Sequence, residues 1–207
     1  MLNNSEINDF YLGKLKEHGP SSKGVGWKDD AAQEIRFRQL IKIIDTADQF
    51  SINDLGCGTG ELLRLLDNGF KGCYRYSGYD ILEEMIINAR KAFPESAEIH
   101  FSKFNHYNEI KPADYTVASG IFNVKNSVKN GPWQEFILET IQAMAEFSVK
   151  GFAFNALTTY SDKEYMRQDL FYSDPLFLFD YCKKNISRNV ALLHDYEIYD
   201  FTILVRK

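Results

Sequence analysis

The chain has 207 residues, of which 44% are hydrophobic and 26% are charged, and its formal net charge is −5. A chain of this length fits one domain and can bury about 70% of its unfolded surface, so it needs neither a metal nor a disulfide to fold. The basic residues are scattered, which argues against a protein that follows the phosphates of DNA.

The cysteines and the N-terminal residues indicate the cellular compartment of the protein. Three cysteines are present, and none forms a C-x-x-C pair, so we expect no disulfide framework and no metal site. The opening residues are polar and acidic, unlike a secretory signal, and no run of 18 apolar residues predicts a membrane span. We therefore expect a cytoplasmic protein without a membrane partner, and the oligomeric state stays open.

Helices and strands alternate along the first 157 residues. A short helix over 5–17 precedes a loop over 18–28 that is rich in Gly and Ser, and a helix over 29–46 follows, with Asp29 and Asp30 at its start. Beyond it, the pattern predicts strands at 50–55, 74–80, 97–104, 113–119 and 151–157, and helices at 61–66, 83–92 and 133–147.

The last fifty residues differ in character. Residues 158–173 are polar and rich in tyrosine, a helix is expected at 175–186, and two strands at 189–194 and 200–206 form a hairpin. The whole pattern predicts an α/β, doubly wound, Rossmann-like sheet of seven strands with an antiparallel C-terminal hairpin and helices on both faces. We expect one domain over 1–207, with a helical lid over 1–46 and an insertion over 158–173 near a substrate.

The most informative segment is NDLGCGTGE over 53–61, which leaves a predicted strand and opens a helix. Ligands of such sheets lie beyond the carboxyl ends of the strands. A dinucleotide fingerprint requires Gly or Ala where Glu61 stands, which disfavours an NAD-dependent oxidoreductase, and the G-K-[ST] of a phosphate-binding loop is absent. The loop therefore suits a ligand without phosphates, such as S-adenosylmethionine (SAM), whose ammonium group Asp54 can help bind.

A second acid, Asp80, stands at the end of the second predicted strand. An acid at this place can accept hydrogen bonds from ribose hydroxyls. Asp80 could instead be the N-cap of the following helix. Ile81 could pack on the adenine.

Three segments, DLGCGTGELL (54–63), SGYDILEEMIINAR (77–90) and ADYTVASGIFN (113–123), resemble the class I SAM-dependent methyltransferases. The resemblance covers about 45–155 and implies SAM as the cofactor, with S-adenosylhomocysteine as the product. It implies that the methionine part of SAM lies among Asp54, Gly56, Cys57 and Gly58, the ribose at Asp80, the adenine at Ile81, Phe104 and Asn105, the sulfonium at Ser119 and Gly120, and the acceptor at Phe122 and Asn123. Asn105 departs from the acid that the family often has.

The N-terminal segment supplies further candidates. Trp27 could close over the cofactor or the acceptor, or it could pack the N-terminal helices onto the sheet. Arg36 could bind the carboxylate of the cofactor or an anionic acceptor, or it could make a structural salt bridge, and Tyr11 is a candidate for acceptor contact. Small-molecule methyltransferases that resemble this chain build their lids from such a segment.

The acceptor is less well defined. His18, His106 and His194 are weak candidates for a general base, each with an ordinary surface role as the alternative. Tyr160 and Arg167 in the insertion are possible acceptor contacts. We expect O- or N-methylation of a small polar acceptor. The alternatives are a protein or RNA methyltransferase, or a SAM-binding subunit without activity.

Overall fold

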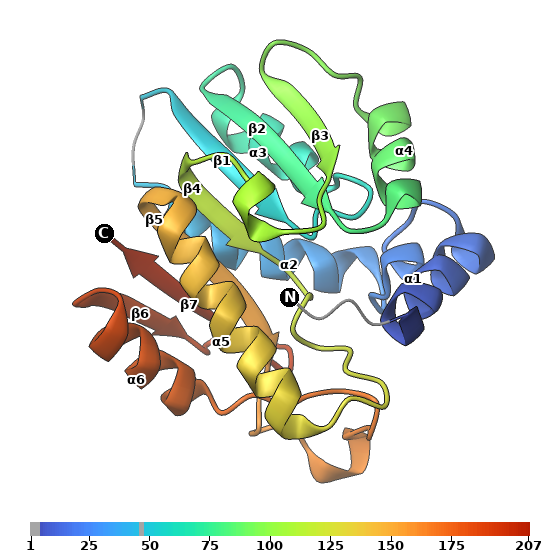
Figure 1. Ribbon diagram of the computed structural model, residues 1–207, viewed down its shortest axis with the longest axis vertical. Helices are drawn as coiled ribbons and strands as arrows, with labels where there is room; N and C mark the ends of the chain where they lie inside the picture. The colour runs from blue at the N-terminus through green and yellow to red at the C-terminus, as the bar shows by residue number, and fades with distance from the viewer. Residues whose placement is uncertain (1–4, 46–47) are drawn as a thin grey trace.

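The computed structural model describes residues 5–45 and 48–207. Their centre is one sheet of seven strands in the order β3-β2-β1-β4-β5-β7-β6 (Figure 1). The first five strands are parallel, while β7 runs antiparallel to both of its neighbours. The strands are β1 (Phe50–Leu55), β2 (Tyr74–Asp80), β3 (Ile99–Lys103), β4 (Ala113–Ala118), β5 (Ser148–Leu157), β6 (Asn189–Leu193) and β7 (Asp200–Arg206).

Helices cover both faces of this sheet (Figure 1). One face packs against α5 (Asn130–Phe147) and α6 (Pro175–Asn185), and the other against α2 (Asp30–Leu40), α3 (Leu62–Phe70) and α4 (Glu83–Ala92). The expected fold class, an α/β Rossmann-like sheet with an antiparallel hairpin at its C-terminal end, is confirmed. None of the described helices is both long and apolar enough to cross a bilayer.

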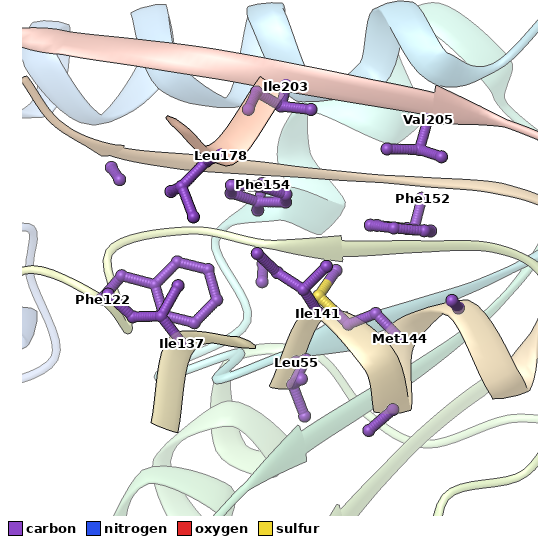
Figure 2. Packing of buried hydrophobic residues seen from close by; sticks show 14 of the residues in the cluster. Leu55, Phe122, Ile137, Ile141, Met144, Phe152, Phe154, Leu178, Ile203 and Val205 are labelled. Carbon is purple, nitrogen blue, oxygen red and sulfur yellow. The ribbon is translucent and has the colours of Figure 1, made fainter. Parts of the chain in front are cut away.

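Large apolar side chains fill the space between the sheet and α5. Figure 2 shows Ile141 and Met144 of α5 against Phe152 and Phe154 of β5. All four of these side chains are fully buried, and burial of such side chains contributes roughly 1.5–3 kcal/mol each. This packing fixes the carboxyl ends of the central strands, where the predicted site lies.

Several element boundaries differ from the prediction; α3 runs to Phe70 instead of residue 66, and α5 begins at Asn130 instead of 133. The helix expected over 29–46 begins after its N-cap, Asp29, which accepts a hydrogen bond from the backbone N of Ala32, and it ends at Leu40. A short 3-10 turn, η2 (Ile41–Ile43), follows, and the helical backbone ends before Ile44, which is extended. Residue 46 lies outside the described residues. The fifth strand begins at Ser148, immediately after α5, instead of at 151.

The N-terminal segment lies beyond the carboxyl ends of β1 and β2 (Figure 1). It comprises α1 (Ser5–His18) and the 3-10 turn η1 (Lys23–Val25), and of the lid predicted over 1–46 the structure describes residues 5–45. Two further 3-10 turns are η3 (Tyr107–Glu109), after β3, and η4 (Lys163–Tyr165), within the insertion. An isolated bridge between Val124 and Leu170 ties the insertion to the loop after β4, and another between Thr158 and Ser173 joins the two ends of the insertion.

Candidate active site

A cavity of about 810 Å³ opens at the carboxyl edge of the sheet. Its volume lies within the range of roughly 300–1,000 Å³ that is typical of small-molecule sites. Its walls come from the loop after β1, the ends of β2 and β4, the N-terminal segment, and the loop that leads into β7. Segments far apart in the sequence therefore enclose one space.

The loop after β1 forms the floor of this cavity. Gly56, Gly58 and Gly60 have φ values of +75°, +54° and +85°, which glycine adopts readily. A Cβ at Gly56 would lie 2.2 Å from Ile121 Cγ2, so only glycine fits there. The backbone N atoms of Gly56 and Cys57 donate to the Tyr79 carbonyl at 2.8 and 3.0 Å, which fixes the loop against β2.

Asp80 binds the same loop through its side chain. One carboxylate oxygen accepts from the backbone N of Gly58 and the other from that of Leu82, each at 2.9 Å. The N-cap of α4 is Leu82, so the interpretation of Asp80 as the N-cap is wrong. Burial raises the pKa of Asp80 to about 6, although the hydrogen bonds from Leu82, Gly58 and Ile81 oppose this rise. At neutral pH the side chain is mostly an anion that can accept further hydrogen bonds.

Asp54 is a second buried carboxylate in this cavity, 3% exposed. Tyr76 donates to it from its hydroxyl at 2.8 Å. Burial raises the pKa of Asp54 to about 7; the Tyr76 hydrogen bond opposes the rise, and the charge of Asp80 adds to it. Two carboxylates in one partly apolar cavity favour a ligand with a cationic group, since the cation would stabilise both charges.

The end of β4 forms the third wall. Asn155 of β5 accepts from the backbone N of Gly120 at 3.1 Å and contacts the Ser119 hydroxyl. Asn123 accepts from the backbone N of Leu157 at 3.1 Å, and it also lines the cavity. Gly120 has a φ of +77°, and a Cβ there would meet the Trp27 ring at 2.5 Å.

Three sequence candidates from the first 45 residues reach the cavity, namely Tyr11 of α1, Trp27 after η1 and Arg36 of α2. Arg36 makes a two-point ion pair with Asp200, which is the structural salt bridge that the sequence left as an alternative. The guanidinium carbon of Arg36 also lies 4.2 Å from the centroid of the Trp27 ring. Burial, together with the charge of Asp80, raises the pKa of Tyr11, so its phenol stays protonated.

Most of the expected site residues meet in this one cavity. Besides Tyr11, Trp27 and Arg36, its lining includes Asp54, Gly56, Cys57, Gly58, Asp80, Ile81, Phe104, Ser119, Gly120, Asn123 and Arg167. The guanidinium of Arg167 pairs with Asp169, and this ion pair limits its freedom to contact an acceptor.

Other expected residues lie elsewhere. Phe122 is fully buried, and its ring packs against Phe154 at 5.5 Å between centroids (Figure 2), so it cannot contact an acceptor. Asn105 is exposed and does not line the cavity, because the chain turns outward after Phe104. Tyr160 is 65% exposed and packs against His194, also outside the cavity.

None of the chain's four histidines lines the cavity. His18 is exposed beside Glu17, and His106 is exposed at the start of η3. His194 lies exposed at the end of β6, where its ring faces Tyr160 and Phe201. The geometry therefore offers no histidine as a general base. Within the described residues, no three His, Cys, Asp or Glu side chains are grouped so that they could hold a metal ion.

Several lining residues escaped the sequence interpretation. They include Ile7 and Phe10 of α1, Gln33 of α2, Thr59, Met85, Tyr107, Trp133 and Phe136, and the run 196–200. The position of residues 196–200 could have been predicted from the expected C-terminal hairpin. Because β7 is the return strand of a hairpin, its first residue reaches the edge of the sheet that the ligand occupies.

No model of a protein family matches the chain. A curated protein of Mycobacterium tuberculosis (strain ATCC 25618 / H37Rv), named "Putative methyltransferase Rv1506c", is 48% identical over 168 residues, which cover 81% of this chain and 99% of that protein. The magnesium protoporphyrin IX methyltransferase (ChlM) of Synechocystis PCC 6803, solved with S-adenosylhomocysteine, has a TM-score of 0.67 at 12% identity and covers 99% of this chain and 100% of its own.

The N-methyltransferase NodS of Bradyrhizobium japonicum WM9, also solved with S-adenosylhomocysteine, has a TM-score of 0.66 at 12% identity, covering 96% of this chain and 97% of its own. The fold and the cavity define a Rossmann-like protein with a cavity of small-molecule size at the carboxyl edge of its sheet. Together with the close relative, they show that the chain belongs to the class I SAM-dependent methyltransferase family. Members of this family are enzymes with SAM as their cofactor.

Proposed function

We propose that this enzyme transfers the methyl group of SAM to an oxygen or nitrogen atom of a small polar acceptor. The observation that carries the proposal is that the glycine loop, Asp80 and the N-terminal segment line the same cavity. A donor bound on the loop and an acceptor bound under the N-terminal segment would therefore lie side by side.

The cofactor's place follows from the polar groups along the floor. Asp80 has carboxylate oxygens available for the ribose hydroxyls, and Asp54 offers a negative charge to the ammonium group. Ile81, Leu82 and Phe104 provide apolar surface for the adenine. Ser119 and Gly120 then adjoin the sulfonium end.

No histidine lines the cavity and the Tyr11 phenol stays protonated, so neither a histidine nor Tyr11 serves as the general base. Methyl transfer can nevertheless be fast, since holding donor and acceptor in line supplies much of the rate enhancement. An acceptor atom that needs no prior loss of a proton, such as a carboxylate oxygen or a neutral amine nitrogen, fits this arrangement.

The enclosure of the cavity supports an acceptor of small size. The lining includes residues of α1 and Trp27, as well as Arg167, Leu170 and residues 196–200. These walls leave room for a compact molecule beside the cofactor. A protein or RNA acceptor would instead have to insert a single side chain or base.

The test has two stages. The melting temperature is measured with SAM, S-adenosylhomocysteine and NAD added separately, because a ligand at about 100 times its Kd adds roughly 2.7 kcal/mol of stability. A library of small carboxylates, amines and alcohols is then screened with SAM for release of S-adenosylhomocysteine. Stabilisation without turnover of any small molecule would favour a protein or RNA acceptor or a SAM-binding subunit without activity. Stabilisation by NAD alone would overturn the proposal.

A further inference from the structure

Arg36 and Asp200 form an ion pair that is almost completely removed from water. Arg36 is 7% exposed and Asp200 is 0% exposed. The Arg36 Nε donates to one Asp200 oxygen at 3.0 Å, Nη2 donates to the other, and Nη1 donates to the Ala32 carbonyl at 2.8 Å. The pair joins α2 to the first residue of β7, 164 positions away in the chain.

Such a pair is a poor device for stability alone. Removing two charges from water costs free energy that their attraction often fails to recover, so apolar residues of similar size can serve a core equally well. Both members of this pair line the cavity. Their position therefore points to a role toward the ligand.

The pair holds Trp27 in place. The guanidinium of Arg36 lies over the Trp27 ring, 4.2 Å from its centroid, which is the geometry of a cation–π contact. The far edge of the same ring rests on Gly120, where a Cβ would come within 2.5 Å of it. Two residues earlier, Val25 rests on Gly58 in the same way, at 3.1 Å from the site of a Cβ. The segment 25–27 thus lies directly on both loops of the proposed cofactor site.

The charge of this arrangement matters, because SAM carries a positive sulfonium and S-adenosylhomocysteine a neutral thioether in its place. If the proposed function holds, the sulfonium lies beside Gly120, next to Trp27. Arg36 alone would place a second positive charge behind the indole. Asp200 cancels that charge while it keeps the guanidinium on the ring.

We infer that Asp200 is a positioning residue for the cofactor. It neutralises Arg36 and fixes the guanidinium on Trp27, so that the indole forms the cavity wall at Gly120 without a net positive charge facing the sulfonium. Asp200 acts through Arg36 and Trp27 and does not itself touch the reacting atoms.

The decisive experiment compares the Kd of SAM with the Kd of S-adenosylhomocysteine in the Asp200→Asn variant by calorimetry at pH 8. Asparagine keeps the shape and one acceptor oxygen but leaves Arg36 uncompensated. We expect the ratio of the two Kd values, SAM over S-adenosylhomocysteine, to rise about tenfold relative to the unchanged protein. Damage to the site's shape alone would weaken both ligands equally and leave the ratio constant.

Two further variants guard against a folding defect in Asp200→Asn. Arg36→Met removes the positive charge behind the indole, so the ratio should not rise as it does in Asp200→Asn. Arg36→Met combined with Asp200→Asn removes both charges, so the ratio should return toward that of the unchanged protein. The other charged side chains of the cavity stay the same in all variants; they are Lys28, Asp54, Asp80, Arg167 and Glu197.

The matched control is Asp114→Asn. Asp114 pairs with Lys150 at 3.2 Å and does not line the cavity. It lies near the amino-terminal end of β4, whereas the cavity lies at the carboxyl ends of the strands. This change removes the same charge from the protein and should leave the ratio unaltered. A ratio that stays constant in Asp200→Asn, or that rises as much in Arg36→Met, would overturn the inference, whereas failure of the unchanged protein to bind either ligand would overturn the proposed function.

Discussion

The two sides of the cavity are built in different ways. The floor comes from segments that are short and close in sequence, since the glycine loop and Asp80 are joined by a hydrogen bond between residues 22 positions apart. The cover comes from the two ends of the chain, where Arg36 meets Asp200 across 164 positions. The floor can therefore be recognised in the sequence as a motif, whereas the cover becomes visible only when the fold is known.

The largest expected effect concerns the floor. Asp80→Ala removes the acceptor of the Gly58 and Leu82 hydrogen bonds and, by our proposal, of the ribose hydroxyls. Charge-assisted hydrogen bonds contribute about 1.5–3 kcal/mol each, so the Kd of S-adenosylhomocysteine should rise by about 100-fold or more in calorimetry. Asp67→Ala, which removes a carboxylate bound to Tyr74 outside the cavity, should leave this Kd unchanged. Equal affinity of the Asp80 variant would show that the floor is not the cofactor site.

The cover is tested next, by Gly120→Ala. The added Cβ would collide with Trp27 at 2.5 Å, so the indole must leave its place and the affinity for SAM should fall by about tenfold. Gly72→Ala is a close control, because Gly72 has a φ of +76° against +77° at Gly120 and open space where its Cβ would stand. Both variants lose stability of the order of 1 kcal/mol from backbone strain.

Trp27 fluorescence, taken as the difference between the protein and its Trp27→Phe variant, reports the displacement. The signal should change in Gly120→Ala and stay the same in Gly72→Ala. Similar affinities in both glycine variants would mean that the cover does not depend on the contact between Trp27 and Gly120.

A smaller effect concerns the charges of the floor without ligand. Burial raises the pKa of Asp54 from 3.8 to about 7, so the folded chain takes up a proton near neutral pH that the unfolded chain takes up only near pH 4. The unliganded protein should therefore become more stable as the pH falls from 8 to 5. In Asp54→Asn the increase in the free energy of unfolding between pH 8 and pH 5 should be smaller by about 2 kcal/mol. Urea unfolding at several pH values measures this difference. Parallel pH profiles for the two proteins would contradict the assignment.

The smallest effect is expected outside both regions. Replacing His18, His106 or His194 by alanine should change the Kd of SAM, and turnover of any acceptor that the screen yields, by less than about twofold, since none of these side chains lines the cavity. Their exposed positions also predict stability changes within about 0.5 kcal/mol. A tenfold loss of turnover in one variant, with an unchanged melting temperature, would restore that histidine as a base.

The sequence predicted the floor because its physical requirements are local. Positive φ angles need glycine, and the spacing of Gly56, Gly58 and Gly60 after a buried strand is visible without the fold. The succession of strands and helices along the chain followed from the same alternation of apolar runs and helices. Helix ends were less predictable, since the extended backbone of Ile44 leaves no clear trace in composition.

The cover and the acceptor side could not be predicted in the same way. Arg36 and Asp200 are ordinary charged residues in the sequence, and only the fold shows that they meet. Phe122 and Asn123 were expected to share one role, but one neighbour faces the core and the other the cavity. After the turn at Gly120 the direction of each side chain depends on backbone geometry that a sequence pattern does not reveal.

The antiparallel direction of β7 also has a practical consequence. The strand starts at Asp200, opposite Leu157 at the cavity edge, and finishes at Arg206, opposite Gly151. Lys207 follows, and its side-chain Nζ donates to the carbonyls of Ala145 and Ser148, near the start of β5 and away from the cavity. A fluorophore or a sensor-chip linker coupled after Lys207 would therefore project away from the ligands, which allows binding to be followed on an immobilised protein whose cavity stays open.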